Sequence, residues 1–252
     1  MRLSKTKPLL KTDTLELLPT PKRIRVLFNG EVVADSKSAA LLFEKGHAPL
    51  YYLPKGDVEM SLLNATDHST HCPRKGDAAY WTLKVGDKRV ENAVWSYPEP
   101  LAGAEPLSNY VAFYQDKVTF FEEDEPLRAH PRDPYHRVDT RLSSRHVKVV
   151  YGSETVAETT RPVLLFETDL TTRYYIPAAD VRLELLTPSD TTTSCPYKGE
   201  ASYYSLNAGG QTAEDLVWTY PQPLPEAFGV RDLLCFYHEK LDEFYVDGEK
   251  LG

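Results

Sequence analysis

The sequence predicts a mainly β protein made of two tandem domains, each an assembly of antiparallel sheets with one or two short helices. Three observations support this prediction. The stretch YYLPKGDV at 51–58 returns as YYIPAADV at 174–181, so the chain repeats itself. Sixteen Tyr and nine Phe among 252 residues favour strands over helices. Nineteen Pro interrupt the chain often, so its elements should be short.

The repeat has a constant offset. THCPRKGDAAYW at 70–81 returns as TSCPYKGEASYY at 193–204, and VENAVWSYPEPL at 90–101 returns as AEDLVWTYPQPL at 213–224. Each copy is too long for a solenoid repeat and long enough for a domain with its own core. We expect these parts in order: an N-terminal arm 1–21, a first repeat domain 22–124, a linker 125–144, and a second repeat domain 145–252. The two domains should be related by an approximate two-fold and pack on each other through the linker and the arm.

Short strands follow one another in the first copy. Residues 23–35 alternate around Asn29-Gly30, which is the strongest short-range hairpin signal. Residues 36–46 have a Ser cap, helix formers and a final Gly46, which predicts a helix. Strands are then expected at 51–54 and 58–63, followed by an irregular polar connection. A second hairpin at 79–97 and two strands within 109–123 complete the copy.

The second copy repeats this order. A hairpin is expected over 146–158, turning at Gly152-Ser153, and a second one turning at Gly209-Gly210. Pro162 stands where the first turn of a helix tolerates proline. Residues 181–186 alternate like 58–63 and predict a strand.

Bulk composition narrows the function classes. A net charge of −8 and a sequence pI near 5.4 argue against nucleic-acid binding. Three Cys are too few for a disulfide framework, which predicts a reducing, cytoplasmic setting. No apolar run is long enough for a membrane span, and the first residues lack the apolar core of a secretory signal.

The polar connections carry the candidate site. Long irregular connections between strands usually carry function. A Lys-Gly after Pro presents an ammonium that suits an anionic ligand group, although a tight turn with a solvated Lys would look the same. Polar ligand contacts are expected from Asp67, Thr70 and Lys75 in the first copy, and from Asp190, Thr193 and Lys198 in the second.

Reactive groups are expected in the same segments. A neighbouring Lys would favour the thiolate of Cys72 or Cys195, so these thiols, or Lys75 and Lys198 themselves, are the candidate catalytic groups. Small buried Cys residues are the alternative. His68 and His71 beside Cys72 fall short of the four ligands of structural zinc, so no metal site is predicted.

Aromatic residues recur beside the polar segments and could wall a pocket. Core packing is the alternative, particularly for the two Trp. The expected wall residues are Tyr52, Tyr80 and Trp95 in the first copy, and Tyr175, Tyr203 and Trp218 in the second. The copies differ beside this set, with His47, Arg74 and Trp81 against Leu170, Tyr197 and Tyr204.

The motif D-x-x-T-x-C-x-x-K-G-x-A-x-Y, followed by A-V-W-S-Y-P-x-P and V-A-F-Y, resembles the domain-of-unknown-function family 427. Both copies match it, at 67–80 and 190–203 with their following segments. The family is also labelled as a nucleotidyltransferase, and its two-copy members resemble a fungal arrangement. The resemblance implies a β-tent-like fold, whose relatives bind small ligands or carry out redox chemistry between the sheets, some with zinc.

Three functions follow as hypotheses. Each domain binds a small polar or anionic organic ligand, with or without catalysis; or the repeat is a structural or protein-interaction module; or it transfers nucleotidyl groups, as the family label suggests. The binding hypothesis predicts that Lys75→Ala with Lys198→Ala leaves the melting temperature nearly unchanged. No phosphate loop or other familiar cofactor motif occurs, so the cofactor stays unknown, as does the oligomeric state.

Overall fold

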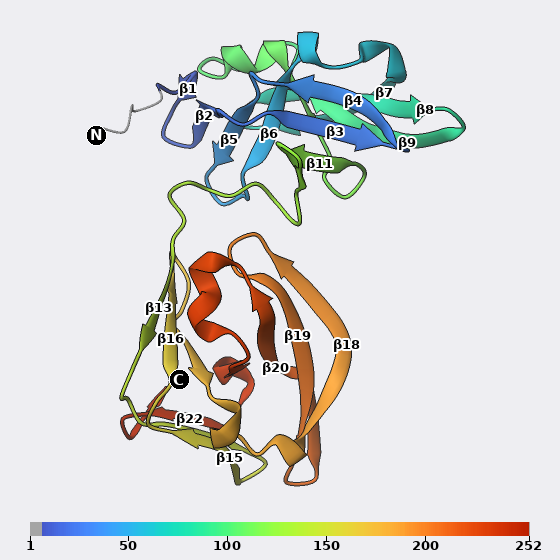
Figure 1. The fold of residues 1–252 in the computed structure, drawn as a ribbon. Helices are drawn as coiled ribbons and strands as arrows, with labels where there is room; N and C mark the ends of the chain where they lie inside the picture. The colour runs from blue at the N-terminus through green and yellow to red at the C-terminus, as the bar shows by residue number, and fades with distance from the viewer. Residues whose placement is uncertain (1–6, 252) are drawn as a thin grey trace. The chain divides into compact units, whose positions relative to one another are not determined.

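The computed structural model describes residues 7–251 and divides the chain into two compact units, Met1–Asp133 and Pro134–Gly252. Each unit contains one large and one small sheet of antiparallel strands, and its helical segments are short 3-10 turns (Figure 1). The predicted mainly β class with antiparallel sheets is therefore confirmed. No α-helix occurs in the part of the chain that the structure describes.

The first unit has a large sheet in the order β1-β2-β5-β6-β10-β9-β8-β7 and a small sheet in the order β12-β11-β3-β4. The large sheet comprises β1 (Leu10–Lys11), β2 (Leu15–Pro19), β5 (Ala40–Glu44), β6 (Leu50–Pro54), β7 (Leu63–Cys72), β8 (Gly76–Val85), β9 (Lys88–Ser96) and β10 (Tyr110–Phe113). The small sheet comprises β3 (Ile24–Phe28), β4 (Glu31–Ser36), β11 (Thr119–Glu122) and β12 (Glu125–Pro126). The 3-10 turns are η1 (Lys55–Asp57), η2 (Met60–Leu62) and η3 (Glu105–Asn109).

The second unit repeats this plan, with sheets in the orders β13-β16-β17-β21-β20-β19-β18 and β15-β14-β22-β23. The large sheet comprises β13 (Val138–Leu142), β16 (Val163–Glu167), β17 (Arg173–Ile176), β18 (Leu186–Cys195), β19 (Gly199–Ala208), β20 (Gln211–Pro223) and β21 (Leu234–Phe236). The small sheet comprises β14 (Val147–Tyr151), β15 (Glu154–Thr159), β22 (Glu243–Val246) and β23 (Glu249–Leu251). The 3-10 turns are η4 (Ala178–Asp180), η5 (Leu183–Leu185), η6 (Pro225–Val230) and η7 (His238–Lys240).

Each unit buries two apolar clusters, one on either face of its large sheet. In the first unit, Ile24 and Val26 of the small sheet pack against Leu53 of β6, whereas Leu17 of β2 belongs to the second cluster. Tyr51 belongs to the first cluster and its neighbour Tyr52 to the second, because successive strand residues face opposite sides. The second cluster adjoins the pocket described below.

The hairpin predictions are confirmed. β3 pairs with β4 across Asn29-Gly30, and β14 with β15 across Gly152-Ser153. β8 and β9, and β19 and β20, form the hairpins predicted at the other Gly-containing turns. Asn29 and Gly30 both have positive φ, 50° and 81°, which is the backbone geometry that makes Asn-Gly a hairpin signal.

The helix predicted over 36–46 is wrong, since this segment contains strand β5. Leu41 packs into one apolar cluster and Leu42 into the other, so the segment is buried on both faces. A short apolar run of this kind fits a doubly buried strand as well as a helix. The helix expected after Pro162 is likewise replaced by a strand, β16.

The strands predicted over 58–63 and 181–186 are mostly wrong too, because these segments hold the 3-10 turns η2 and η5. The polar connection of the first copy, conversely, is strand β7. It stands at the edge of the sheet and exposes most of its side chains, so turn-forming polar residues are tolerated there. Its pairing with β8 is interrupted between Ala65 and Ser69, which marks a bulge.

The structural repeat reaches into the segments expected as arm and linker. In the first unit β2 pairs with β5, with Leu15 opposite Glu44. In the second unit β13 pairs with β16, with Val138 opposite Glu167, which is the same register. The equivalent strands β2 and β13 therefore belong to the structural repeat, although their residues show little sequence similarity.

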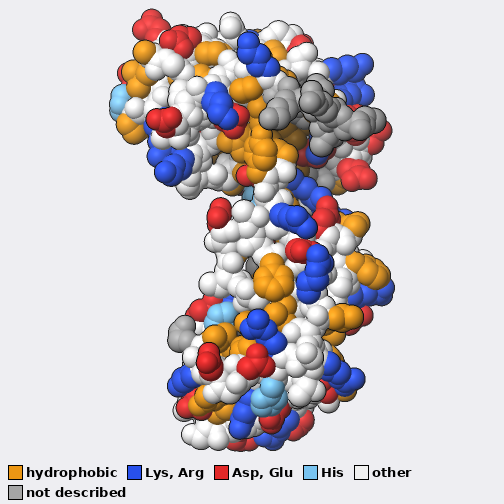
Figure 2. Space-filling model, turned by 90° about the vertical axis from the view of Figure 1, so that its left-hand side faces the viewer, with side chains coloured by type: hydrophobic (Ala, Val, Ile, Leu, Met, Phe, Trp, Pro, Cys, Tyr) orange, Lys and Arg blue, Asp and Glu red, His pale blue; other side chains and the backbone are white. Residues whose placement is uncertain are grey.

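The surface carries charges of both signs. Figure 2 shows Lys and Arg side chains interspersed with Asp and Glu side chains over the face that it presents. Among residues 7–251, no helix has both the length and the apolar character that crossing a membrane requires.

Candidate ligand-binding pockets

Each unit contains a pocket beside its second apolar cluster, and the two pockets are built from equivalent positions. The cavity volumes are about 450 Å³ in the first unit and about 260 Å³ in the second. The equivalent lining residues are Glu44, Cys72, Lys75, Tyr80, Trp95, Tyr97 and Tyr114 in the first unit, and Glu167, Cys195, Lys198, Tyr203, Trp218, Tyr220 and Tyr237 in the second.

A buried ion pair lies in the first pocket. The Lys75 ammonium contacts the Glu44 carboxylate, and their side chains are only 8% and 13% exposed. Glu44 is the last residue of β5, whereas Lys75 belongs to the turn between β7 and β8. Gly76 follows with a φ of 103°, and a Cβ there would lie 3.2 Å from the carbonyl oxygen of Glu99. The absence of a side chain at Gly76 thus lets the turn approach residues 99–101 closely.

The Glu44 carboxylate also contacts a second cationic side chain, that of Arg74. Arg74 Nη1 donates to Glu44 Oε1 at 3.3 Å and to the carbonyl oxygen of Lys45 at 2.9 Å. Burial raises the pKa of Glu44, but the hydrogen bond from Lys75 and the charges of Lys75, His47 and Arg74 outweigh burial, so its pKa is lowered. Glu44 is therefore an anion at neutral pH, and its charge is balanced locally.

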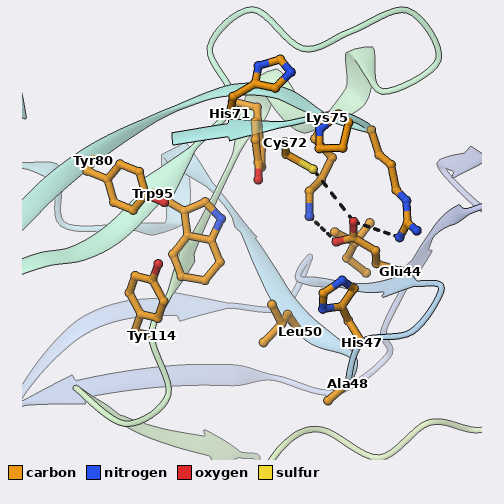
Figure 3. Close-up of a pocket in the computed structure, with 14 residues that line it drawn as sticks. Glu44, His47, Ala48, Leu50, His71, Cys72, Lys75, Tyr80, Trp95 and Tyr114 are labelled. Atoms are coloured by element: carbon orange, nitrogen blue, oxygen red, sulfur yellow. Dashed lines mark hydrogen bonds and ion pairs between the residues drawn. The ribbon is translucent and has the colours of Figure 1, made fainter. Parts of the chain in front are cut away.

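Aromatic rings form the opposite side of the pocket. Figure 3 shows Tyr80, Trp95 and Tyr114 grouped together, across from Glu44 and Lys75. The Trp95 and Tyr114 ring centroids are 4.6 Å apart, and Tyr80 Oη hydrogen-bonds Thr70 Oγ1 at 2.8 Å. Burial raises the pKa of Tyr114 to about 12, so its hydroxyl stays protonated at neutral pH. The pocket thus has a charged end and an aromatic end.

The second pocket retains the ion pair with different neighbours. Lys198 contacts Glu167, and their side chains are 13% and 6% exposed. His136 Nε2 lies 3.0 Å from Glu167 Oε1, and the His136 ring stacks on Tyr197 at 4.1 Å. Tyr197 occupies the position of Arg74, so a neutral ring replaces the guanidinium at this end.

The aromatic end of the second pocket contains an arginine. The Arg173 guanidinium lies 5.5 Å from the Trp218 ring centroid and 5.7 Å from that of Tyr237. It also forms two contacts with the carboxylate of Glu239, at 2.8 and 2.9 Å. The equivalent position in the first unit is Leu50, which lines the first pocket without charge.

Most of the residues predicted for the site line a pocket. Cys72, Lys75, Tyr80 and Trp95 line the first, and Tyr175, Thr193, Cys195, Lys198, Tyr203 and Trp218 line the second. Thr70 reaches the first pocket through its hydrogen bond to Tyr80, and Tyr52 is fully buried in the cluster behind it. Asp67 and Asp190 are exposed and line neither pocket.

The Cys72 thiol lies beside a carboxylate. Cys72 Sγ is 4.0 Å from Glu44 Oε1, and the Lys75 ammonium is engaged by the same carboxylate. The Glu44 carboxylate therefore stands beside both the Cys72 thiol and the Lys75 ammonium. Cys72 and Cys195 are half-buried free thiols.

The histidines beside Cys72 do not converge on it. The His68 ring packs on Tyr80 at 4.6 Å, and His71 Nδ1 lies 2.6 Å from Asp77 Oδ1. Within the described residues, no group of three or more His, Cys, Asp or Glu side chains is arranged to hold a metal ion.

Sequence reasoning missed Glu44 and Glu167, the carboxylates at the charged ends. The signal was present, because Phe43-Glu44 returns as Phe166-Glu167. The helix predicted over 36–46 obscures this signal. Arg173 was also missed, since a residue that differs between copies does not stand out in a comparison of the repeats.

Fold and pockets define a protein of two homologous antiparallel β units, each with its own cavity. A family model for a domain of unknown function, DUF427, matches residues 16–124 and 139–247. The chain therefore belongs to the DUF427 family, with one copy of the domain in each unit. A comparison with curated proteins finds no match.

Proposed function

We propose that each unit binds a small organic anion in its pocket, within the β-tent-like arrangement that the family resemblance implies. The observation that supports this proposal is the charge of the lining. Two cationic side chains and one carboxylate line each pocket, Lys75 and Arg74 with Glu44 in the first. The two cations of each lining favour an anion, which in the second pocket competes with Glu239 for Arg173, and the aromatic end favours an apolar part of the same molecule.

Binding is favoured over covalent catalysis. Lys75 and Lys198 are each held by a carboxylate, so a nucleophilic attack by the amine would first have to break a buried ion pair. We therefore propose that the protein binds a ligand. We also propose that it works in the cytoplasm, because a reducing compartment suits its three free cysteines.

Two alternatives remain as hypotheses with weaker support. Nucleotidyl transfer commonly uses clustered carboxylates that hold metal ions, and each pocket lining contains one carboxylate. A purely structural module would account for the buried ion pairs, which connect β5 to the β7–β8 turn, but it would not require an open cavity with an aromatic end.

The burial of the lysines changes the test expected from sequence. Lys75→Ala would leave Glu44 buried beside a void, so a lower melting temperature no longer separates binding from a structural role. The outer aromatic wall is a better target, because Tyr114 is 37% exposed and uncharged, so its truncation should cost less stability than the loss of a buried ion-pair partner.

The experiment incubates the purified full chain with a metabolite extract, separates the protein by gel filtration, and identifies released molecules by mass spectrometry. The wild type should carry an enriched organic anion, and the Tyr114→Ala, Tyr237→Ala double variant should lose it. Tyr135→Ala is the matched control, because Tyr135 is 67% exposed and lines neither pocket. The proposal fails if no anion is enriched, or if the double variant retains it.

A further inference from the structure

The two pockets place their second cation at opposite ends. In the first pocket, Lys75 and Arg74 both contact the carboxylate of Glu44, so both charges stand at the charged end. Among the Lys and Arg side chains that line the second pocket, Lys198 contacts Glu167 at this end, and Arg173 lies over the Trp218 ring. The second pocket therefore presents one cation at each end.

Leu50 and Arg173 occupy equivalent positions, at the starts of β6 and β17. Figure 3 shows Leu50 between the aromatic group and His47, where its side chain offers only apolar contact. Because an arginine fork binds a carboxylate through two parallel hydrogen bonds, the exchange of Leu for Arg changes what this part of the cavity can recognise.

We propose that the pockets bind different anions and that the position of Leu50 and Arg173 determines the difference. The second pocket binds a small dianion, such as a dicarboxylate, with one charged group toward Lys198 and the other toward Arg173. The first pocket binds a monoanion with an apolar or aromatic body, whose charge lies at Lys75 and Arg74. This inference rests on the proposed function, and the smaller second cavity, about 260 Å³ against 450 Å³, agrees with it.

Glu239 gives the inference a sharp test. It pairs with Arg173 from η7, is 45% exposed, and does not line the pocket. A dianion would compete with this carboxylate for the guanidinium. Removal of the Glu239 charge should therefore strengthen dianion binding, whereas removal of Arg173 should weaken it. If the Arg173–Glu239 pair only stabilised the fold, both changes would weaken binding or leave it unchanged.

The chain supplies its own reporters, since it contains three Trp: Trp81, Trp95 and Trp218. Trp95 lines the first pocket and Trp218 the second, while Trp81 lines neither and serves as a reference. The full chain is labelled with 5-fluorotryptophan, and its three fluorine resonances are assigned with single Trp→Phe variants. Succinate and phenylacetate are then titrated separately at constant ionic strength, because screening would otherwise differ between them.

We expect succinate to shift the Trp218 resonance with a Kd at least about tenfold lower than at Trp95, and phenylacetate to favour Trp95. Arg173→Leu should raise the succinate Kd at Trp218 at least about tenfold, and Glu239→Gln should lower it. Leu50→Arg should give Trp95 a response to succinate.

The inference is overturned if the Trp95 and Trp218 resonances shift equally with both probes. It is also overturned if the Trp218 resonance does not shift with succinate up to about 10 mM. It is also overturned if Arg173→Leu leaves the succinate Kd unchanged. Those results would leave the proposed function intact wherever the extract experiment yields an enriched anion. If no anion is enriched from the extract and neither the Trp95 nor the Trp218 resonance shifts with either probe, both the proposed function and this inference are refuted.

Discussion

Replacing Lys75 with methionine removes the ammonium that balances Glu44 but retains the length of the side chain. Both side chains are nearly buried, at 8% and 13% exposure, so solvent can screen the remaining carboxylate only weakly. Loss of one partner of a buried pair costs about 3–5 kcal/mol. Arg74 still contacts the carboxylate at 3.3 Å, so we expect the low end, about 3 kcal/mol.

The pH dependence of this loss follows from Glu44. Its pKa is lowered in the folded wild type, although burial raises it, so the pair contributes stability above the unfolded pKa that is lost as pH falls through the folded pKa. Without Lys75, fewer positive charges offset the effect of burial, so the pKa of Glu44 in the folded protein rises. The difference in unfolding free energy between Lys75→Met and wild type should therefore be full near pH 7 and shrink toward pH 4.

Urea unfolding followed at the fluorine resonances of Trp95 and Trp218 separates the two units, which need not unfold together. Lys75→Met should lower the transition reported by Trp95 and leave that of Trp218 in place. The control Lys84→Met removes an exposed lysine of β8 and should cost less than about 0.5 kcal/mol. A loss below about 1 kcal/mol at neutral pH, or a loss independent of pH, would refute the reasoning.

Two further predictions concern thiols and glycines. Iodoacetamide at neutral pH should label half-exposed Cys72 in the folded protein but reach Cys235 only after unfolding, because burial raises the pKa of the Cys235 thiol; comparable native labelling rates would contradict this. Gly210→Ala should cost about 1 kcal/mol for its positive φ alone, since no atom lies within 4 Å of the new Cβ. Gly209→Ala should cost at least about 2 kcal/mol more, because its Cβ would lie 2.2 Å from the carbonyl oxygen of Gly152; equal unfolding free energies for the two variants would show that this contact relaxes freely.

The fold was predictable where the signal was local. Asn29-Gly30 adopts the positive φ values that its residues favour, and the hairpin forms around it. The strand β5 was not predictable in this way. Its Leu41 and Leu42 pack on opposite faces of a sheet that distant segments complete, so pairing with β2 and β6 outweighs the local helix signals.

The site was predictable to the extent that the repeat displayed it. Lys75 was found because a Lys-Gly stands at the same place in both copies. Its partner Glu44 lies 31 residues earlier, in a segment without polar clustering, and only the folded sheet brings the two together. Asp67 is a different case, because this residue is shared by both copies but lies exposed on the edge strand β7, outside the pocket lining.

The pocket features that the two copies share and those in which they differ have different physical causes. The Lys–Glu pair connects the same two structural segments in both units, so the cost of an unpaired buried charge is enough to explain its presence. The second cation has no such explanation, because Arg74 gives way to Tyr197 while Leu50 gives way to Arg173. The lining keeps two cations and one carboxylate although the position of the second cation changes. Fold stability does not require this balance, whereas two pockets for different anions would.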